Sequence, residues 1–351
     1  MFHVKQLGGD NMSIYLNNGY IDMGSLFLHE ARFVTITGAR GTGKTYGASM
    51  FLLTVCNNDT QFIWLRRTST EADIISTTDS SPFKKYCLDN DIALPEVKRV
   101  SKQVSGAFVN DECIGFICGL STFSNIRGAE GLFAKVQYAF YDEFIPEAHV
   151  RKMKGEYHAI LNFYETVNRN RELQGDDALK LVMASNSNDI ANPWFMGLEI
   201  VDNIVKLQKK QQEKAYYPDR DLLIINIMKS KISERKSKTA LYKLNKESSF
   251  NDMALSNFFD MDNTNISSRR LKDYIPVVKY GEMCIYIKKD ESEFYVNCHC
   301  VGNVREIKYG TKDAEVYFKR TYGYVMASHI FNHDVIFENQ TARILFEKAF
   351  E

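Results

Sequence analysis

The sequence predicts an α/β protein with an N-terminal domain built on a parallel sheet that has helices on both faces, and a smaller C-terminal α+β domain. Short apolar runs alternate with helical patterns through about residue 200, which is typical of such a sheet. A glycine-rich turn separates the first apolar run from the first helix. The 351 residues, 44% of them hydrophobic and 25% charged, are typical of a globular chain with room for two cores.

Four apolar runs are the predicted strands of the first domain: 32–37, 61–65, 136–141 and 179–184. Helices are predicted between them, at 46–53 and 156–167. The pattern changes after residue 205. It predicts a polar helix at 206–214, a hairpin with strands at 283–287 and 293–298, and a closing helix at 340–350.

The net charge of +0, from 44 basic and 44 acidic residues, hides an asymmetry. Residues 206–246 hold 12 Lys and Arg against 4 Asp and Glu. Such an excess suits a polyanion, because phosphate contacts release counterions, although a solvated helix face gives the same pattern. The candidate DNA contacts are the basic residues Lys209, Lys210, Lys229, Lys231, Arg235, Lys236 and Lys238.

These changes of pattern define the expected domain boundaries: a first domain over 1–205, a basic linker segment over 206–230, and a β-rich domain over 231–351. No apolar run reaches the ~18 residues of a membrane span, and the N-terminus lacks the layout of a signal peptide. The seven scattered cysteines predict no disulfide framework and, by default, a reducing cytoplasmic setting. Cys298-His299-Cys300 is spaced too tightly for a zinc knuckle.

Residues 38–45, Gly-Ala-Arg-Gly-Thr-Gly-Lys-Thr, match the phosphate-binding pattern G-x-x-x-x-G-K-[ST] between a strand and a helix. Backbone N–H groups of such a P-loop surround phosphate oxygens, and the helix N-terminus adds positive charge. Lys44 is expected to reach the β- and γ-phosphates of ATP, and the Thr45 hydroxyl to bind Mg²⁺. The predicted nucleotide-binding residues are those of the motif and the next tyrosine, which could touch the base: Gly38, Ala39, Arg40, Gly41, Thr42, Gly43, Lys44, Thr45 and Tyr46.

The apolar run at 138–141 ends in a pair of acids, Asp142-Glu143. Asp142 suits Mg²⁺ binding, and Glu143 suits a general base that polarises an attacking water. An adjacent glutamate favours a P-loop ATPase of the catalytic-glutamate type over a kinase, which must exclude water. Such pairs also occur on ordinary surfaces, and the P-loop upstream is what favours the Walker-B interpretation.

Three further residues are catalytic candidates. Asn186 follows the apolar run at 181–184, and in ATPases with an additional central strand that position senses the γ-phosphate; capping a turn is the alternative. Arg169 and Arg171 follow a predicted helix and could stabilise the charge of the transition state on a neighbouring subunit of a ring. A surface salt bridge is the alternative for either arginine.

Further motifs accompany the P-loop: Phe-Ile-Trp-Leu-Arg-Arg at 62–67, Tyr-Asp-Glu-Phe at 141–144, Thr-Val-Asn-Arg-Asn-Arg-Glu at 166–172, Ser-Asn at 185–186, and Asn-Pro-Trp-Phe at 192–195. Their order and spacing through residues 33–200 resemble the small genome-packaging ATPases of tailed phages with short linear double-stranded DNA, which are compact relatives of terminase large subunits. The resemblance implies an ATPase that uses ATP and Mg²⁺ to drive viral double-stranded DNA into a preformed capsid.

The same resemblance implies a homopentameric ring in the host cytoplasm that docks transiently on the portal (connector) protein at the vertex of the procapsid. It leaves open whether a packaging RNA is a further partner. By position it implies Arg169 as the trans-acting arginine finger, Arg171 as the runner-up, and Arg127 as a second basic residue linked to the neighbouring site. Arg40 would contact the nucleotide or hold Glu143 back before ATP arrives.

The C-terminal half resembles, by its position, the RNase H-like nuclease of terminases, whose carboxylates bind two metal ions. Lys288 and Lys289 stand where the family's strand would offer an aspartate, and Asp260, Asp262 and Asp334 do not follow predicted strands. We therefore expect a degenerate nuclease fold that has lost cleavage and kept a basic surface.

Two other functions stay open at this point. A helicase- or transfer-like P-loop ATPase would act on nucleic acid without a capsid, and its ATPase would respond to single strands. A nucleotide-dependent regulator would hydrolyse little ATP, and Glu143 argues against it because a switch protein gains nothing from an efficient base.

Overall fold

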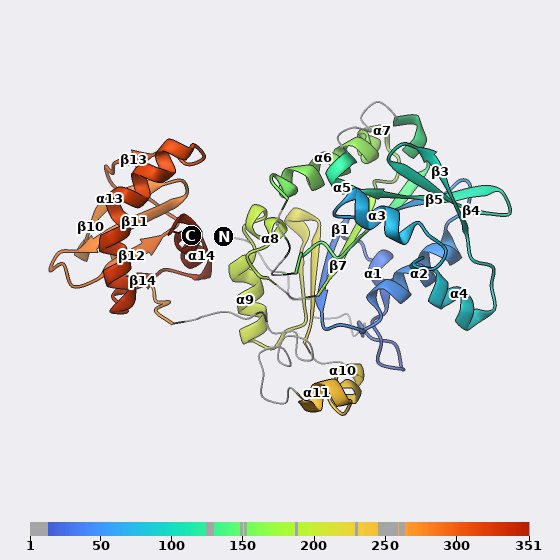
Figure 1. Ribbon diagram of the computed structural model, residues 1–351, viewed down its shortest axis with the longest axis horizontal. Helices are drawn as coiled ribbons and strands as arrows, with labels where there is room; N and C mark the ends of the chain where they lie inside the picture. The colour runs from blue at the N-terminus through green and yellow to red at the C-terminus, as the bar shows by residue number, and fades with distance from the viewer. Residues whose placement is uncertain are drawn as a thin grey trace. The chain divides into compact units, whose positions relative to one another are not determined.

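The computed structural model describes residues 13–123, 130–147, 150, 153–186, 189–228, 231–244, 259 and 264–350 (Figure 1). The chain divides into two compact units. Unit 1 is drawn from 1–197 and 207–260, and unit 2 from 198–206 and 261–351.

The sheet of unit 1 has nine strands among the described residues. In spatial order they are β3 (Glu96–Ser101), β4 (Val104–Val109), β5 (Glu112–Gly119), β2 (Gln61–Arg66), β6 (Val136–Asp142), β7 (Lys180–Ser185), β1 (Phe33–Gly38), β9 (Leu222–Ile227) and β8 (Lys214–Tyr217). The six from β5 to β9 in this order run parallel, whereas β3, β4 and β8 pair antiparallel at the two edges. The carboxyl ends of the parallel strands therefore meet at one edge.

The predicted fold class is confirmed. The four predicted strands correspond to β1, β2, β6 and β7, and β7 lies between β1 and β6 as the additional strand. β3, β4, β5, β8 and β9 were not predicted from the sequence. β3 has no buried residue, so it carries no apolar pattern from which a strand could be predicted.

Helices cover both faces of the sheet of unit 1. On one face, α1 (Met23–Phe27) packs on α2 (Lys44–Val55), with the rings of Phe27 and Phe51 stacked at 4.5 Å. On the other, the indole Nε1 of Trp194 donates to the Thr35 hydroxyl of β1 at 3.0 Å. The described helices of unit 1 also include α3 (Ser69–Ile75), α4 (Lys84–Asn90), α5 (Leu120–Phe123), α6 (Glu156–Asn168), α7 (Arg171–Gln174), α8 (Pro193–Gly197), α10 (Lys231–Lys236) and α11 (Ala240–Leu244).

The segment 206–230 differs from the expected basic linker. The helix α9 (Val201–Lys209) ends before the predicted helix would, and Lys214–Tyr217 and Leu222–Ile227 form β8 and β9. β9 pairs with β1 along its whole length and every one of its residues is buried. This burial makes β9 part of the core of unit 1, because an apolar strand next to β1 stabilises the sheet by removing apolar surface from water.

Unit 2 is an α+β structure, as predicted. Its described sheet has the order β13 (Glu306–Ile307), β10 (Tyr274–Tyr280), β11 (Met283–Lys288), β12 (Phe294–Asn297), β14 (Val335–Phe337), with α13 (Lys312–Phe331) and α14 (Gln340–Phe350). The predicted hairpin is β11–β12, and the predicted closing helix is α14. Residues 198–206 join this unit because Asp202 caps α14, accepting from Gln340 N and the Thr341 hydroxyl.

The cysteines differ in part from the expectation. Cys284 of β11 and Cys300, 16 residues later, form a disulfide because the β11–β12 hairpin returns the chain to the same place. Cys298 and the four cysteines of unit 1 are free thiols. Among the described residues, no group of three or more His, Cys, Asp or Glu could hold a metal ion, and no helix is long and apolar enough to cross a membrane.

Candidate nucleotide-binding and hydrolysis site

The P-loop joins β1 to α2 at the carboxyl edge of the sheet. Gly41 and Gly43 have φ values of +75° and +92°, a left-handed conformation that favours glycine. The loop borders a cavity of about 740 Å³. Its other walls come from the N-terminal segment at Leu16 and Tyr20 and from Tyr46 and Met50 of α2.

Lys44 is folded back on its own loop. Its Nζ donates to the carbonyl oxygens of Gly38 and Ala39 at 2.8 and 3.0 Å, and lies 3.3 Å from Oδ1 of Asn186. Burial lowers the pKa of Lys44 to about 7, although the carboxylates of Asp142 and Glu143 oppose this shift. An ammonium whose hydrogen bonds go to uncharged oxygens, those of carbonyls and of the Thr42 hydroxyl, is poised to exchange them for phosphate oxygens, which form stronger, charge-assisted hydrogen bonds.

Thr45 and Asp142 fit a Mg²⁺ site. The Thr45 Oγ1 lies 3.5 Å from Oδ1 of Asp142, so one ion could bind both oxygens. Burial raises the pKa of Asp142 to about 6, with the guanidinium of Arg66 as the main opposing influence. Mg²⁺ at nucleotide sites uses one or two protein oxygens together with phosphates and water, so a larger cluster of acids is not needed.

Glu143 is held by Arg66, a residue that the sequence analysis quoted but gave no role. Arg66 Nη2 donates to Oε2 of Glu143 at 2.5 Å, and Nη1 donates to Oδ2 of Asp142 at 3.2 Å. The register explains this contact, because Leu65 of β2 lies beside Tyr141 of β6 and the next residues on each strand face one another. A guanidinium at the end of β2 therefore bridges both Walker-B acids.

Arg40 does not take the role of holding Glu143 back. Its guanidinium pairs with Glu147, and both side chains are about half exposed. The contact expected between Arg40 and Glu143 is made by Arg66 instead. Asn186 fits the sensor prediction in position, since it follows β7 and contacts Lys44 at the cavity wall. A base contact by Tyr46, which also lines the cavity, stays a prediction.

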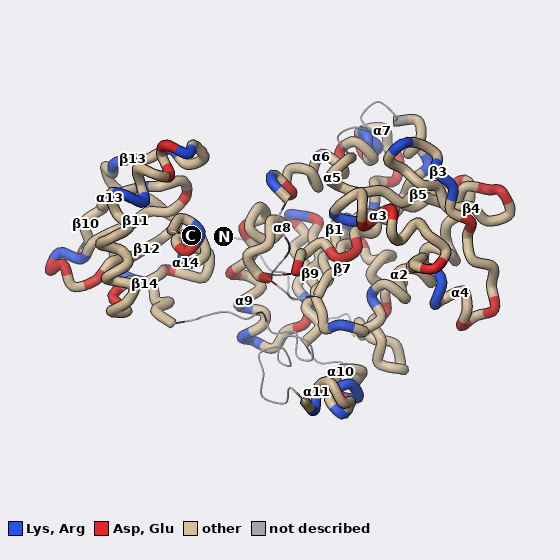
Figure 2. Tube along the Cα trace, viewed as in Figure 1, with Lys and Arg blue, Asp and Glu red and all other residues tan. Residues whose placement is uncertain are grey.

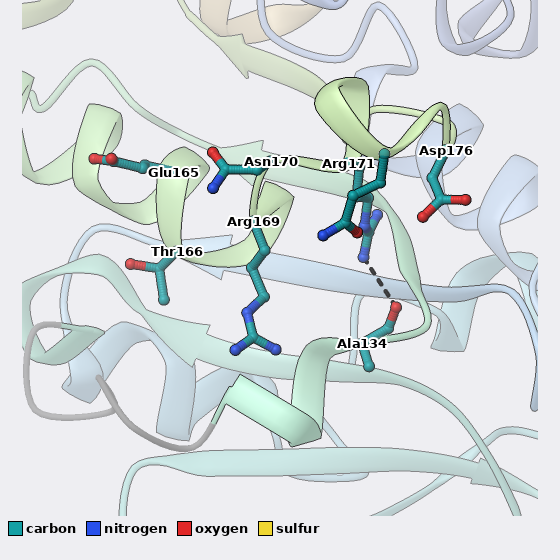
Figure 3. Close-up of a pocket in the computed structure, with 8 residues that line it drawn as sticks. Ala134, Glu165, Thr166, Arg169, Asn170, Arg171 and Asp176 are labelled. Carbon is teal, nitrogen blue, oxygen red and sulfur yellow. Dashed lines mark hydrogen bonds between the residues drawn. The ribbon is translucent and has the colours of Figure 1, made fainter.

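Arg169 and Arg171 border a different cavity, of about 760 Å³, at the C-terminal end of α6 and beside α7 (Figure 3). Arg171 donates to the backbone carbonyls of Val136 and Ala134 at 2.5 and 3.0 Å, which fixes the chain that leads into β6. This structural use of its donors argues against the runner-up role of Arg171 as a finger. Arg169 is the left-handed C-cap of α6, with φ +51°, and its guanidinium lies apart from that of Arg171 (Figure 3).

The basic residues predicted to contact DNA differ in their exposure and in their contacts. Lys209 and Lys210 are exposed at the end of α9, and Arg235 and Lys238 are exposed in and just after α10. Figure 2 shows basic positions along the chain at α9 and at α10. Lys236 is half buried, and its Nζ donates to the backbone carbonyl of Arg40 in the P-loop. Two of the other predicted site residues, Arg127 and Lys229, lie outside the described residues, and Lys231 begins α10.

Fold and site together define a P-loop ATPase with an additional central strand and a Walker-B glutamate. The family model described as podovirus DNA encapsidation protein (Gp16) matches residues 16–315. The chain belongs to this family, and it is an ATPase that drives DNA packaging into a capsid.

Solved structures agree with this fold. The Phi-28 gp11 DNA packaging motor is 19% identical, with 96% of this chain and 99% of that chain covered, at a TM-score of 0.61. The bacteriophage Phi-29 viral genome packaging motor assembly is also 19% identical, with the same coverage, at 0.59. At this identity the likeness shows a shared fold. No match was found among curated protein sequences.

Proposed function

We propose that this chain forms a homopentameric ring at the portal vertex of a preformed capsid and threads double-stranded DNA through it, with ATP hydrolysed in each subunit. The observation that carries the ATPase part is the convergence of Lys44, Asp142 and Glu143 on one cavity. The ring and portal part rests on the family and on the solved Phi-29 structure, which is described as a packaging motor assembly. In this proposal the protein works in the host cytoplasm, and a packaging RNA is a partner that experiment must test.

In the proposed hydrolysis step, each of these residues of the cavity has its own role. Lys44 and the backbone of the P-loop bind the phosphates, and Thr45 and Asp142 would hold Mg²⁺, which neutralises charge on the phosphate oxygens. Glu143 accepts a proton from the attacking water. In this proposal Glu143 first leaves Arg66, because the guanidinium binds Oε2 and fixes the orientation of the carboxylate.

Arg169 completes the site of a neighbouring subunit in this proposal. The support is its position, since Arg169 borders a cavity other than the one that contains Lys44 of its own chain. A guanidinium presented at the surface of one subunit can stabilise the transition-state charge of the next, as arginine fingers do. Arg127 would be the second basic residue at that junction.

We further propose that the exposed basic residues of the segment, with Lys209 and Lys210 as examples, contact DNA phosphates, and that unit 2 lacks nuclease activity. The support for the second point is local. Asp334 lies 3.7 Å from Nδ1 of His329, and Lys288 ends β11 with Lys289 directly after it. Asp260 and Asp262 lie outside the described residues.

The test is steady-state ATPase of the full chain with duplex DNA, with single-stranded DNA and without DNA, at one salt concentration. Stimulation by duplex that is abolished in Lys44→Ala supports the packaging function. Stimulation by single strands alone would favour the helicase- or transfer-like alternative and contradict the proposal.

A further inference from the structure

The segment that follows β9 places a lysine side chain against Arg40 and Gly41 of the P-loop. Lys236, the last residue of α10, donates from Nζ to the carbonyl oxygen of Arg40 at 2.5 Å. A Cβ added at Gly41 would lie 2.5 Å from the same nitrogen, so the lysine side chain fills the space directly over that glycine. Arg40 and Gly41 both line the nucleotide cavity, so Lys236 lies directly beside two of its lining residues.

The backbone around Lys236 is fixed rather than extended into solvent. Thr239 donates to the Lys236 carbonyl through both its N–H and its hydroxyl, each at 2.9 Å. Ile232 and Tyr242, on either side in sequence, are buried. The lysine is therefore presented to the P-loop by a segment with its own anchors.

Lys236 adds a positive charge beside two other basic groups of the P-loop. Among the residues that the structure describes, no carboxylate lies within ion-pair distance of its ammonium, whereas Arg40 and Lys44 are close enough to repel it. Burial and the charge of Arg40 lower the pKa of Lys236. Arg40 is paired with Glu147, and Lys44 lies near Asp142 and Glu143, so Lys236 is the cation of this loop that a nucleotide's phosphates would supply with a counter-charge.

We propose that Lys236 is a nucleotide-binding residue: it contributes a third basic group, beside Lys44 and Arg40, to the phosphates of ATP bound at the P-loop. This inference rests on the proposed function of that site and changes the assignment of Lys236 from a DNA contact to a nucleotide contact. One ammonium has three donors, so Lys236 can keep the Arg40 carbonyl and still bind a phosphate oxygen.

A nucleotide contact by Lys236 would also affect the chain segment in which this lysine lies. Lys236 lies after the last strand of the nine-stranded sheet and before residues 261–351, the larger part of unit 2. A nucleotide contact at this point ties the connecting segment to the occupancy of the P-loop. The segment would be held more tightly when ATP is bound than when the site is empty.

The test is a titration of the full-length protein with a fluorescent, non-hydrolysable ATP analogue and Mg²⁺, in the absence of DNA. Lys236→Ala and Lys236→Met remove the charge, and Lys236→Met keeps the aliphatic stem over Gly41. Hydrogen bonds to charged groups are worth enough to predict a loss of about tenfold in affinity for both variants. Lys238→Ala is the matched control, because it removes the same charge from an exposed residue of the same segment. Lys236→Arg should retain most of the affinity.

The outcomes separate this inference from the proposed function. Wild-type affinity in Lys236→Met would overturn it, as would an equal loss in Lys236→Met and Lys238→Ala, which would indicate a general charge effect. Loss of duplex binding in Lys236→Met with unchanged nucleotide affinity would return the residue to the DNA surface. Failure of the proposed function would appear elsewhere, as absent stimulation by duplex DNA in the wild type, and Lys44→Ala should abolish analogue binding whichever result is found for Lys236.

Discussion

Replacing Arg66 by alanine should release Glu143 and raise ATP hydrolysis in the absence of DNA. The Glu143 side chain is 55% exposed, so its contact with Arg66 is screened by water and is worth about 1 kcal/mol rather than the ~3 kcal/mol of a buried charged pair. A loss of about 1 kcal/mol corresponds to roughly a fivefold increase in the population of unpaired Glu143. We therefore expect basal kcat to increase by up to about fivefold.

The same substitution also affects Asp142, and the two effects can be separated. Asp142 is buried and Arg66 is the main group that opposes the rise of its pKa, so Arg66→Ala should raise that pKa further and increase the Mg²⁺ concentration needed for half-maximal activity. Basal kcat should therefore be measured at saturating Mg²⁺. Lys135→Ala, which removes an exposed pair with Asp59 elsewhere in the sheet, serves as the control. Unchanged or lower basal kcat at saturating Mg²⁺, in a variant that binds nucleotide normally, would refute the restraining role of Arg66.

Three further predictions concern single residues. Glu143→Gln should bind ATP with wild-type affinity and lose turnover by about 10²–10⁴-fold, and normal turnover would exclude Glu143 as the base. Arg169→Ala should lose activity alone and regain it in mixed rings with Lys44→Ala subunits, which supply an intact arginine; absence of rescue would argue against action in trans. Glu156→Gln should lower the free energy of unfolding, measured with urea, by about 3 kcal/mol, because it leaves the buried guanidinium of Arg67 without its counter-charge; a change below about 1 kcal/mol would contradict this.

The parts of the fold that the sequence predicted are those with local signals. The P-loop could be predicted because its glycines, lysine and threonine are contiguous and lie between an apolar run and a helix. The strand β3 could not, because its residues are exposed or half-buried and no apolar alternation marks it. β9 had a signal, the apolar run Leu-Leu-Ile-Ile-Asn-Ile at 222–227, but the surrounding basic residues suggested a linker. Charge composition indicates what a surface can bind and does not exclude a buried strand between charged stretches.

The site residues also fall into two groups: those that contiguous motifs predict, and those that reach the site only because of the fold. Lys44, Asp142 and Glu143 belong to motifs that can be found one at a time. Arg66 became a site residue only through strand order, because β2 must lie next to β6 before its terminal side chain can meet the Walker-B acids. Lys236 meets the P-loop across 196 positions of sequence, and no periodicity predicts such a contact.

Two adjacent arginines at the end of β2 connect the acids of the cavity to helix α6. Arg66 faces the acids of the cavity, whereas Arg67 forms two hydrogen bonds with Glu156, the first residue of α6, in a buried pair that Tyr141 joins by donating to the same carboxylate. α6 ends at the C-cap Arg169. A buried ion pair tolerates little displacement once its partners are desolvated. Any movement of the β2 terminus that frees Glu143 must therefore either strain the Arg67–Glu156 pair or move the N-terminus of α6 as well. The pairing therefore offers a physical connection between release of the catalytic glutamate and the position of the arginine that we assign to the neighbouring subunit. Glu156→Gln mixed with wild-type subunits would test that connection through the ATPase of the ring as well as through stability.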